Sequence, residues 1–392
     1  MIPASVCTRT KRYRSTGTVS TRVIFIVSLP WVAHSRRDFV PVFSHRVLID
    51  CAAAVFGAVG APPAVAIRVA EALVDANLAG HDSHGVIRIP QYVDAIRDGE
   101  VVPGATPTIS RDTAVSALVD GGWGFGQVTA LRATDLAIEK AKRTGIAAVG
   151  AVRCNHIGRV GEYPERAARA GVIAFVVAGG FGGRGGRAAP FGGREGILGT
   201  NPMAFGIPSA SEAPMLVDFA TTAVAAGKIQ VARAKGASLP PGSILDKDGN
   251  PSTNAEDFYQ GGVMLPFGGH KGYALSMVVE MMGRVLTGAD DYAEGGRGGA
   301  VYGRSGTLVV AIDPGLFRDR DTFATGVSET IGRVKAVPPA PGFTEVLVPG
   351  EPEERARAER TASGVYVEDA TAAAIRATAS ALGLDPNATL PS

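Results

Sequence analysis

Apolar residues near the start of the chain follow helical spacing. Three helices are predicted over 48–59, 63–79 and 87–96, because apolar positions recur there every three or four residues. Gly80 comes directly after the second pattern, and glycine is a typical residue just beyond a helix end. The polar residues that follow Gly80 are therefore expected to leave a helix end, where their side chains can reach into a cleft.

Strand-like apolar runs alternate with helical patterns in the middle of the chain. Strands are predicted over 108–120, 146–152, 172–178, 198–208, 215–222 and 308–312. Helices are predicted over 128–144, 162–170, 225–234, 273–286, 319–333 and 372–382, and the stretch 236–262 is rich in turn residues. This alternation indicates an α/β protein.

The composition argues against a nucleic-acid-binding or membrane protein. The 392 residues have a formal net charge of +2, with 46% apolar and 19% charged residues, so no basic face is implied. No segment reaches the ~18 apolar residues that a membrane-spanning helix needs. Cys7, Cys51 and Cys154 are too far apart to suggest a disulfide framework, which favours a reducing compartment. A cytoplasmic location is therefore predicted, with no nucleic-acid or membrane partner.

Residues 1–42 are predicted to form an extension outside the fold. They are rich in Arg, Ser and Thr and contain a short apolar run, 23–33. A basic stretch before such a run is typical of secretory signals and transit peptides. A disordered extension, or a reading frame begun too early, is the favoured interpretation because the remainder of the chain has the features of a cytosolic protein.

The segment from Gly80 to Arg88 contains the clearest candidates for catalytic residues. It contains two of the six histidines, His81 and His84, together with Ser83 and Arg88. Histidine can exchange a proton near neutral pH, a neighbouring hydroxyl can orient its ring, and an arginine can hold a carboxylate through two hydrogen bonds. A metal site is not predicted, because the H-x-x-H pair has no third ligand nearby. From this segment alone, a merely structural cluster is an equal alternative.

Two glycine-rich segments raise the question of a cofactor. Residues 268–272, Gly-Gly-His-Lys-Gly, open an apolar helix, whose free N–H groups could bind an anion together with Lys271. The alternative is a tight turn with a solvated lysine. Residues 180–185 match G-x-G-x-x-G, but no helical pattern follows, so this segment is not predicted to be a Rossmann dinucleotide site.

Six ordered motifs together resemble the malate/L-lactate dehydrogenase family, from about residue 43 to the C-terminus. They read GHDSHGVIRIPQYV, NHIGRVGEY, GTNPMAFGIP, DFATTAVAAGK, PFGGHKGYALSMVVEMM and VLVPGE. The resemblance implies an oxidoreductase that uses NAD or NADP, has no Rossmann fold and forms a homodimer. It also implies a helical domain from both chain ends, over 43–115 and about 320–392, and an α/β domain with a mixed sheet over 116–319. The loop APFGGREGILGTNP resembles the hydroxycarboxylate dehydrogenase branch most.

The resemblance also assigns roles to individual positions. Ser83 and His84 match the relay hydroxyl and the proton donor, Arg88 matches a substrate-binding arginine, and Thr200 falls at a substrate position. His156 matches a cofactor segment, although some members of the family assign it the catalytic base, and Lys228 could stabilise a developing alkoxide. The positions that match cofactor contacts are His156, Ile157, Gly158, Arg159, Val160, Asp218, Phe219, Ala220, His270, Lys271, Pro349, Gly350 and Glu351.

These observations predict hydride transfer between NAD(P) and a 2-hydroxycarboxylate or 2-oxo acid, with His84 as proton donor and acceptor. Two alternatives remain open: a different substrate, such as a cyclic imine or ureidoglycolate, and a nucleotide-binding homologue that has lost catalysis. The sequence selects neither the hydroxy acid nor NAD over NADP. It also leaves open whether His84 or His156 carries the proton.

Overall fold

The computed structural model describes residues 41–180, 186–211 and 213–391. Its centre is a seven-stranded sheet with the strand order β2-β3-β4-β11-β5-β6-β7. The strands are β2 (Thr108–Asp112), β3 (Ser116–Gly124), β4 (Ile146–Cys154), β5 (Ile173–Gly179), β6 (Met203–Ile207), β7 (Met215–Phe219) and β11 (Gly306–Ile312). Of the neighbouring pairs in this sheet, β3 and β4 alone run parallel. The sheet is therefore mixed, as predicted, and differs from the parallel sheet of a Rossmann domain.

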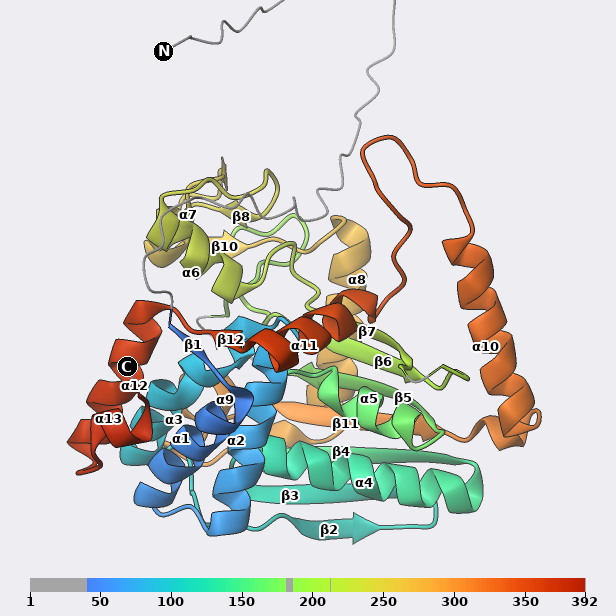
Figure 1. Ribbon diagram of the computed structural model, residues 1–392, viewed down its shortest axis with the longest axis horizontal. Helices are drawn as coiled ribbons and strands as arrows, with labels where there is room; N and C mark the ends of the chain where they lie inside the picture. The colour runs from blue at the N-terminus through green and yellow to red at the C-terminus, as the bar shows by residue number, and fades with distance from the viewer. Residues whose placement is uncertain (1–40, 181–185, 212, 392) are drawn as a thin grey trace, which may run out of the picture. The chain divides into compact units, whose positions relative to one another are not determined.

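Helices cover both faces of this sheet. Helices α4 (Gly126–Thr144) and α5 (Glu162–Arg169) lie in front of it in Figure 1. Helix α8 (His270–Glu280) and the π-helical turn Met281–Val285 pack on the opposite face. Alternate residues of a strand point to opposite faces, and accordingly Val176 joins the core under α4 and α5 while Val177 joins the core with Val279 of α8.

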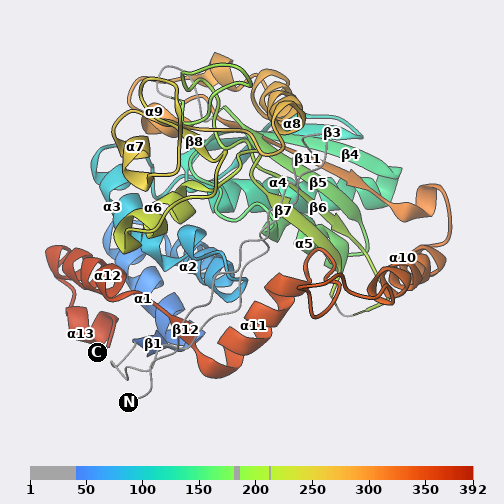
Figure 2. The same ribbon diagram turned by 90° about the horizontal axis from the view of Figure 1, so that it is seen from above.

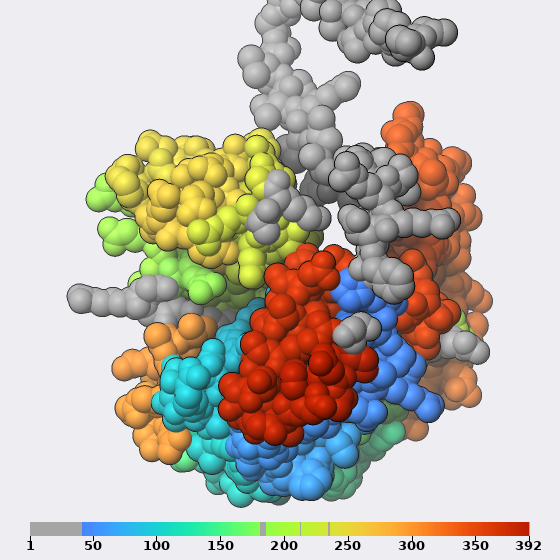
Figure 3. All heavy atoms as spheres, turned by 60° about the vertical axis from the view of Figure 1, so that its left-hand side comes forward, coloured from blue at the N-terminus to red at the C-terminus, as the bar shows by residue number. Residues whose placement is uncertain are grey.

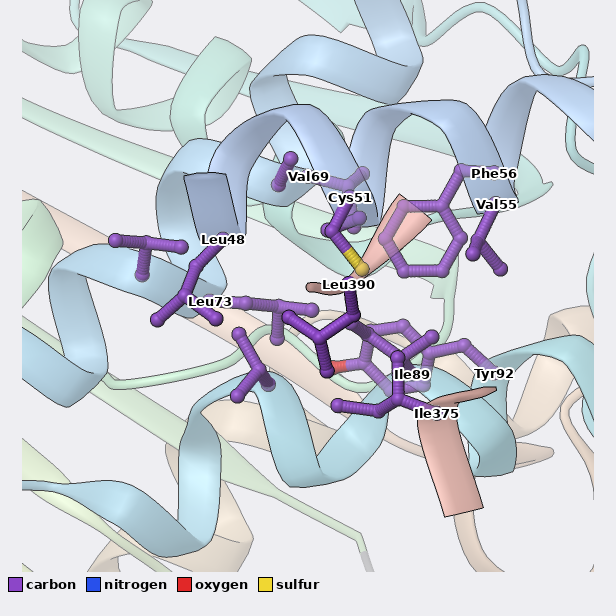
Figure 4. Close-up of a cluster of buried hydrophobic side chains, with 14 of the residues drawn as sticks. Leu48, Cys51, Val55, Phe56, Val69, Leu73, Ile89, Tyr92, Ile375 and Leu390 are labelled. Atoms are coloured by element: carbon purple, nitrogen blue, oxygen red, sulfur yellow. The ribbon is translucent and has the colours of Figure 1, made fainter. Parts of the chain in front are cut away.

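A second hydrophobic core contains residues from both ends of the described chain. Helices α1 (His45–Ala58), α2 (Pro63–Leu78) and α3 (Ile89–Arg97) pack there with α12 (Asp369–Ala381) and α13 (Pro386–Thr389). Figure 4 shows Leu48, Phe56 and Leu73 beside Ile375 and Leu390 in this core. Strand β1 (Val42–Phe43) pairs with β12 (Val365–Tyr366), and the C-terminal segments lie against the N-terminal helices in Figure 3.

The fold begins slightly earlier than predicted. Val42 pairs with Tyr366, and the carbonyl of Pro41 accepts a hydrogen bond from Val367, so both residues belong to the fold rather than to the extension. The described residues all belong to one compact unit. Its division into a helical domain and an α/β domain stays a prediction.

The remaining elements surround the central sheet and its helices. They are the short helices Asp82–His84 and Val86–Arg88, the helices α6 (Ala226–Lys235), α7 (Ala255–Tyr259), α9 (Gly299–Tyr302), α10 (Arg320–Lys335) and α11 (Glu351–Ser363), and the turns Ala289–Tyr292 and Pro314–Leu316. The turn-rich stretch contains a three-stranded sheet of β8 (Ile244–Leu245), β9 (Pro251–Ser252) and β10 (Val263–Met264). Figure 2 shows α10 beyond the ends of the central strands, where Ala210 of the loop after β6 donates to it, while α11 contacts α2.

Three further sequence predictions concern the G-x-G-x-x-G segment, the cysteines and the absence of a membrane-spanning helix. The G-x-G-x-x-G segment falls largely on 181–185, outside the described residues. Cys51 and Cys154 are buried free thiols, and burial raises the pKa of Cys154 to about 12. In the part of the chain that the structure describes, no helix combines the length and apolar character needed to span a bilayer.

Candidate active site

The segment that follows α2 forms a tight double turn held by one buried amide. The Nδ2 group of Asn77 donates to Asp82 Oδ1 (2.7 Å), and its Oδ1 accepts from the N–H of Val86 (2.9 Å). Gly85 is required because a Cβ at this position would lie 2.2 Å from Asn77 Oδ1. As predicted from Gly80, helix α2 ends just before this turn, which holds Ser83 and His84 between the two anchored residues.

Ser83, His84 and Arg88 lie in direct contact. The Ser83 hydroxyl is 3.1 Å from Nδ1 of His84, within hydrogen-bond distance. Arg88 donates from Nε to the Ser83 carbonyl (2.7 Å) and from Nη1 to Gln91 Oε1 (2.6 Å). These two bonds fix the guanidinium plane, and Nη2 takes part in neither of them.

His156 joins this cluster from the other side of the site. It follows β4, and its ring stacks on His84 with centroids 5.4 Å apart and planes 15° apart. The Nδ1 atom of His156 is 2.6 Å from the hydroxyl of Tyr92, which also receives a hydrogen bond from Gln127. The two histidines, 72 positions apart in the sequence, therefore share one site beside Arg88.

Both imidazoles are held in the neutral form. Burial, followed by the positive charge of Arg88, lowers the pKa of His84 from 6.5 to about 3. Burial, Arg88 and His84 lower the pKa of His156 well below 6.5. A carboxylate bound at Arg88 would offset the repulsion that this arginine exerts, and would raise both pKa values toward neutrality.

The segment 216–228 connects the other predicted motifs to this cluster. The N–H of Leu216 donates to the Pro349 carbonyl, and Asp218 Oδ2 accepts from the N–H of Gly161 (2.8 Å). Thr221 donates to the Thr200 carbonyl through both N–H and hydroxyl, and its own carbonyl accepts from Phe267. Gly227 then lies against Ser83. This one segment therefore contacts all five of the other motifs.

The start of α8 has features that suit a nucleotide phosphate. Among the described residues no side chain caps helix α8, so its first N–H groups have no capping acceptor there, and His270 and Lys271 are exposed. A Cβ at Gly268 would meet no heavy atom of the described chain within 4 Å, which leaves the backbone before the helix open to a ligand. Free N–H groups, the helix dipole and a lysine together form an anion site.

Other predicted cofactor residues are engaged within the protein. Arg159 is buried and pairs with Asp75 (2.9 Å) and Glu165 (2.8 Å). Burial disfavours its charge, but the two carboxylates outweigh this effect and raise its pKa. Glu351, in the first turn of α11, pairs with Lys335 and Arg355.

The remaining predicted residues lie in several of the segments already described. Ile157, Gly158 and Val160 belong to the loop that follows His156. Asp218 is buried, and this burial raises the pKa of its carboxyl group. Phe219 and Ala220 follow Asp218 directly, Gly350 caps α11 with a φ of 93°, and Thr200 contributes its carbonyl to Thr221. Lys228 is exposed one residue after the Gly227–Ser83 contact, and in the described chain its ammonium group forms no hydrogen bond with Ser83 or His84.

Comparison with known proteins identifies the family. The family model described as malate/L-lactate dehydrogenase matches residues 43–376. The chain belongs to the malate/L-lactate dehydrogenase family. The predicted resemblance is confirmed, as is the prediction that the chain is an enzyme.

Relatives within this family carry names for different substrates. The chain is 41% identical to the L-sulfolactate dehydrogenase of Methanothermobacter thermautotrophicus over 309 residues, 77% of this chain and 85% of that protein. It is 35% identical to a Δ1-pyrroline-2-carboxylate/Δ1-piperideine-2-carboxylate reductase of Pseudomonas putida, over 81% of this chain and 90% of that protein. The structure of malate dehydrogenase from Entamoeba histolytica superposes with a TM-score of 0.82 at 28% identity, covering 88% of this chain and 99% of that one. Family membership therefore leaves the substrate undecided.

Three residues of the site were not predicted from the sequence. Tyr92 lies four positions after Arg88, on the same side of the helical segment, and this spacing was a usable signal. Gln127, directly before the helix predicted over 128–144, and Asn77, within the helix predicted over 63–79, carry no such signal. Their roles depend on contacts that only the folded chain creates.

Proposed function

We propose that this member of the malate/L-lactate dehydrogenase family oxidises a 2-hydroxycarboxylate to a 2-oxo acid, and reverses the reaction, with NAD or NADP. The observation that carries the proposal is the convergence of His84, His156 and Arg88. A 2-oxo acid needs one cation for its carboxylate and one proton donor for its carbonyl oxygen. This cluster supplies both within one site.

The residues of the chain have separate roles in this reaction. Arg88 binds the substrate carboxylate, and the bonds from Nε and Nη1 keep its guanidinium in one orientation. His84 protonates the oxo oxygen during reduction and accepts that proton during oxidation, while Ser83 orients its ring through Nδ1. Burial of the cluster limits water around the reacting oxygen, which strengthens these interactions.

The nicotinamide cofactor supplies or removes the hydride when it is bound. The uncapped start of α8 with Lys271 and His270 would hold its phosphates. The loop from His156 to Val160 and the segment from Asp218 to Ala220 border the same site and would contact the remainder of the cofactor. The donor set of this chain therefore suits a dinucleotide, without selecting NAD or NADP.

A homodimer is proposed as the working assembly. Val278, Met281, Val285 and Leu286 are each more than two-fifths exposed and follow helical spacing along α8 and its π-helical continuation. Helix α10 has no buried residue of its own. Exposed apolar surface of this extent is typical of a surface that another chain covers.

A second candidate function is reduction of a cyclic imine that carries a carboxylate. The relative named as a pyrroline- and piperideine-carboxylate reductase favours it. Such a substrate would use the same arginine for its carboxylate, and the same histidine would protonate nitrogen instead of oxygen.

An absorbance assay of cofactor oxidation tests both candidates. The purified full chain is incubated with NADH or NADPH and with pyruvate, oxaloacetate, phenylpyruvate, 2-oxoglutarate or Δ1-piperideine-2-carboxylate. Turnover of an oxo acid supports the first proposal, and turnover of the imine alone supports the second. Nucleotide binding without turnover of any of these compounds contradicts both and favours a catalytically silent homologue.

A further inference from the structure

A chain of hydrogen bonds extends from His156 into the protein interior. Nδ1 of His156 is 2.6 Å from the hydroxyl of Tyr92, and Gln127 donates from Nε2 to the same hydroxyl at 2.7 Å. Gln127 is 0% exposed and Tyr92 is 5% exposed, so water does not compete for these bonds. His156 lies in the loop after β4, Tyr92 in α3 and Gln127 in α4.

The direction of these bonds follows from the chemistry of the groups. The amide nitrogen of glutamine can only donate, so the Tyr92 oxygen accepts from Gln127. A phenol has one proton, and among the residues that the structure describes the remaining hydrogen-bond partner of the Tyr92 hydroxyl is His156 Nδ1. Nδ1 is therefore an acceptor without a proton. A neutral imidazole with an unprotonated Nδ1 carries its proton on Nε2.

We propose that Gln127, acting through Tyr92, is a positioning residue that holds neutral His156 as the Nε2–H tautomer. In this tautomer His156 donates a hydrogen bond to the substrate oxygen and cannot accept a proton from it at Nε2. The proton exchange then falls to His84. The assignment of the tautomer stands on the hydrogen bonds alone, and its consequence for substrate rests on the proposed function.

Two features around Gln127 indicate that the fold specifically supports these hydrogen bonds. A Cβ at Gly126 would lie 2.1 Å from the carbonyl oxygen of Asn155 and 2.4 Å from that of His156, so the start of α4 is pressed against the loop that carries His156. The Oε1 atom of Gln127 is buried without a partner in the described chain. An unpaired buried acceptor costs about 1–3 kcal/mol, which makes glutamine an unfavourable residue here for packing alone.

Side-chain nitrogen NMR of the full-length protein tests the tautomer directly. Histidine labelled with ¹⁵N is incorporated, and the His156 signals are assigned by their loss in His156→Gln. The wild type is expected to show a protonated Nε2 and an unprotonated Nδ1 at neutral pH. A proton on Nδ1 would overturn the proposal. This readout needs no substrate, so it stays informative if no hydroxy acid is turned over.

Variants of the two supporting residues connect the tautomer to the reaction. Gln127→Met removes the donor to Tyr92, so the phenol can accept as well as donate, and a mixture of His156 tautomers is expected. Tyr92→Phe removes the bond to Nδ1 altogether and provides a second test if Gln127→Met does not fold. In both variants we expect kcat to fall about tenfold or more with a smaller change in KM.

A control on the same helix separates this role from general damage to α4. Thr134 is fully buried and donates from its hydroxyl to the Ala130 carbonyl, without contact to Tyr92 or Gln127. Thr134→Val is expected to retain the wild-type nitrogen spectrum of His156 and its kcat. An unchanged spectrum in Gln127→Met, or the same kcat loss in Thr134→Val, would overturn the proposed role of Gln127.

Discussion

Gly227 and Ser83 are in contact where helix α6 begins. A Cβ atom on Gly227 would lie 2.4 Å from the Cβ of Ser83, far closer than two such atoms can approach. The absence of a side chain at 227 therefore allows the two segments to meet. This contact fixes the start of α6 against the turn that carries His84.

Replacing Gly227 with alanine is expected to displace that turn. The added methyl group would push Ser83 away from His84 Nδ1, which lies 3.1 Å from the Ser83 hydroxyl. A small displacement of a reacting group can cost about 10²-fold in rate, and we expect kcat/KM of Gly227→Ala to fall at least tenfold in steady-state assays. Gly57→Ala in α1, where a Cβ would meet nothing within 4 Å, is the matched control and is expected to keep full activity. Equal activity of both variants would contradict the positional role of this contact.

The helices, strands and motifs that depend on local sequence pattern could be predicted from the sequence. Apolar periodicity located helices such as α4 and strands such as β5 to within a few residues, and the six motifs identified the family. Helix α11 was missed because none of its residues is buried and its regularity lies in charge, with three glutamates in its first turn. Insertion of β11 between β4 and β5 pairs segments more than 120 positions apart, which no local pattern encodes.

The candidate site shows the same difference between contacts within one segment, which can be predicted, and contacts between distant segments, which cannot. Ser83, His84 and Arg88 are close in sequence, and their contact could be predicted from one segment. The stacking of His84 on His156 and the bond from Tyr92 depend on how α3 and β4 pack, and were not predicted. For Arg159 the motif predicted a cofactor contact, whereas the fold surrounds its guanidinium with Asp75 and Glu165.

Removal of the His84 imidazole is expected to slow the chemical step. His84→Asn leaves a polar side chain of smaller size that cannot exchange a proton, and kcat should fall by about 10²-fold or more. His156→Asn is the comparison, because it removes the stacked ring but leaves His84 and its Ser83 contact. Unchanged kcat in His84→Asn together with a large loss in His156→Asn would move the proton exchange to His156.

Loss of the Arg88 guanidinium is expected to weaken substrate binding more than catalysis. Arg88→Met keeps the aliphatic stem but removes the cation, so KM for the carboxylate substrate should rise about tenfold or more, with a smaller effect on kcat. The loss of positive charge should also raise the pKa of His84 and His156, since Arg88 lowers both. The pH profile of kcat/KM would report this shift, and an unaltered profile with unchanged KM would contradict both roles of Arg88.

Acid is expected to destabilise the protein partly through the two site histidines. Their pKa values are lowered in the folded state, to about 3 for His84, so the unfolded chain binds more protons below pH 6.5. The contribution of the neutral imidazoles to the free energy of unfolding is therefore fully present above about pH 6.5, and it is lost as the pH falls toward about 3. The decrease in Tm between about pH 7 and about pH 4 should be smaller in His84→Gln than in the wild type. His45→Gln, at the start of α1 and outside the site, is the control, and an equal decrease in all three proteins would refute the assignment.

Arg360 of helix α11 is expected to stabilise the active-site turn from outside. Its Nη1 donates to the Asn77 carbonyl and to Asp82 Oδ1 (2.6 Å), and Nη2 donates to Asp82 Oδ2 (3.1 Å). Arg360→Ala removes this bidentate pair and leaves Asp82 held by the Asn77 amide alone, so the turn with Ser83 and His84 should become more mobile. We expect kcat to fall about three- to tenfold with little change in Tm, because partly exposed ion pairs contribute only about 0–1 kcal/mol to stability. Arg360→Lys can restore one of the two bonds and should recover part of the activity. Glu359→Ala, at the neighbouring exposed position of the same helix, should leave kcat unchanged; a similar loss in Glu359→Ala would assign the effect to α11 as a whole rather than to the Arg360–Asp82 contact.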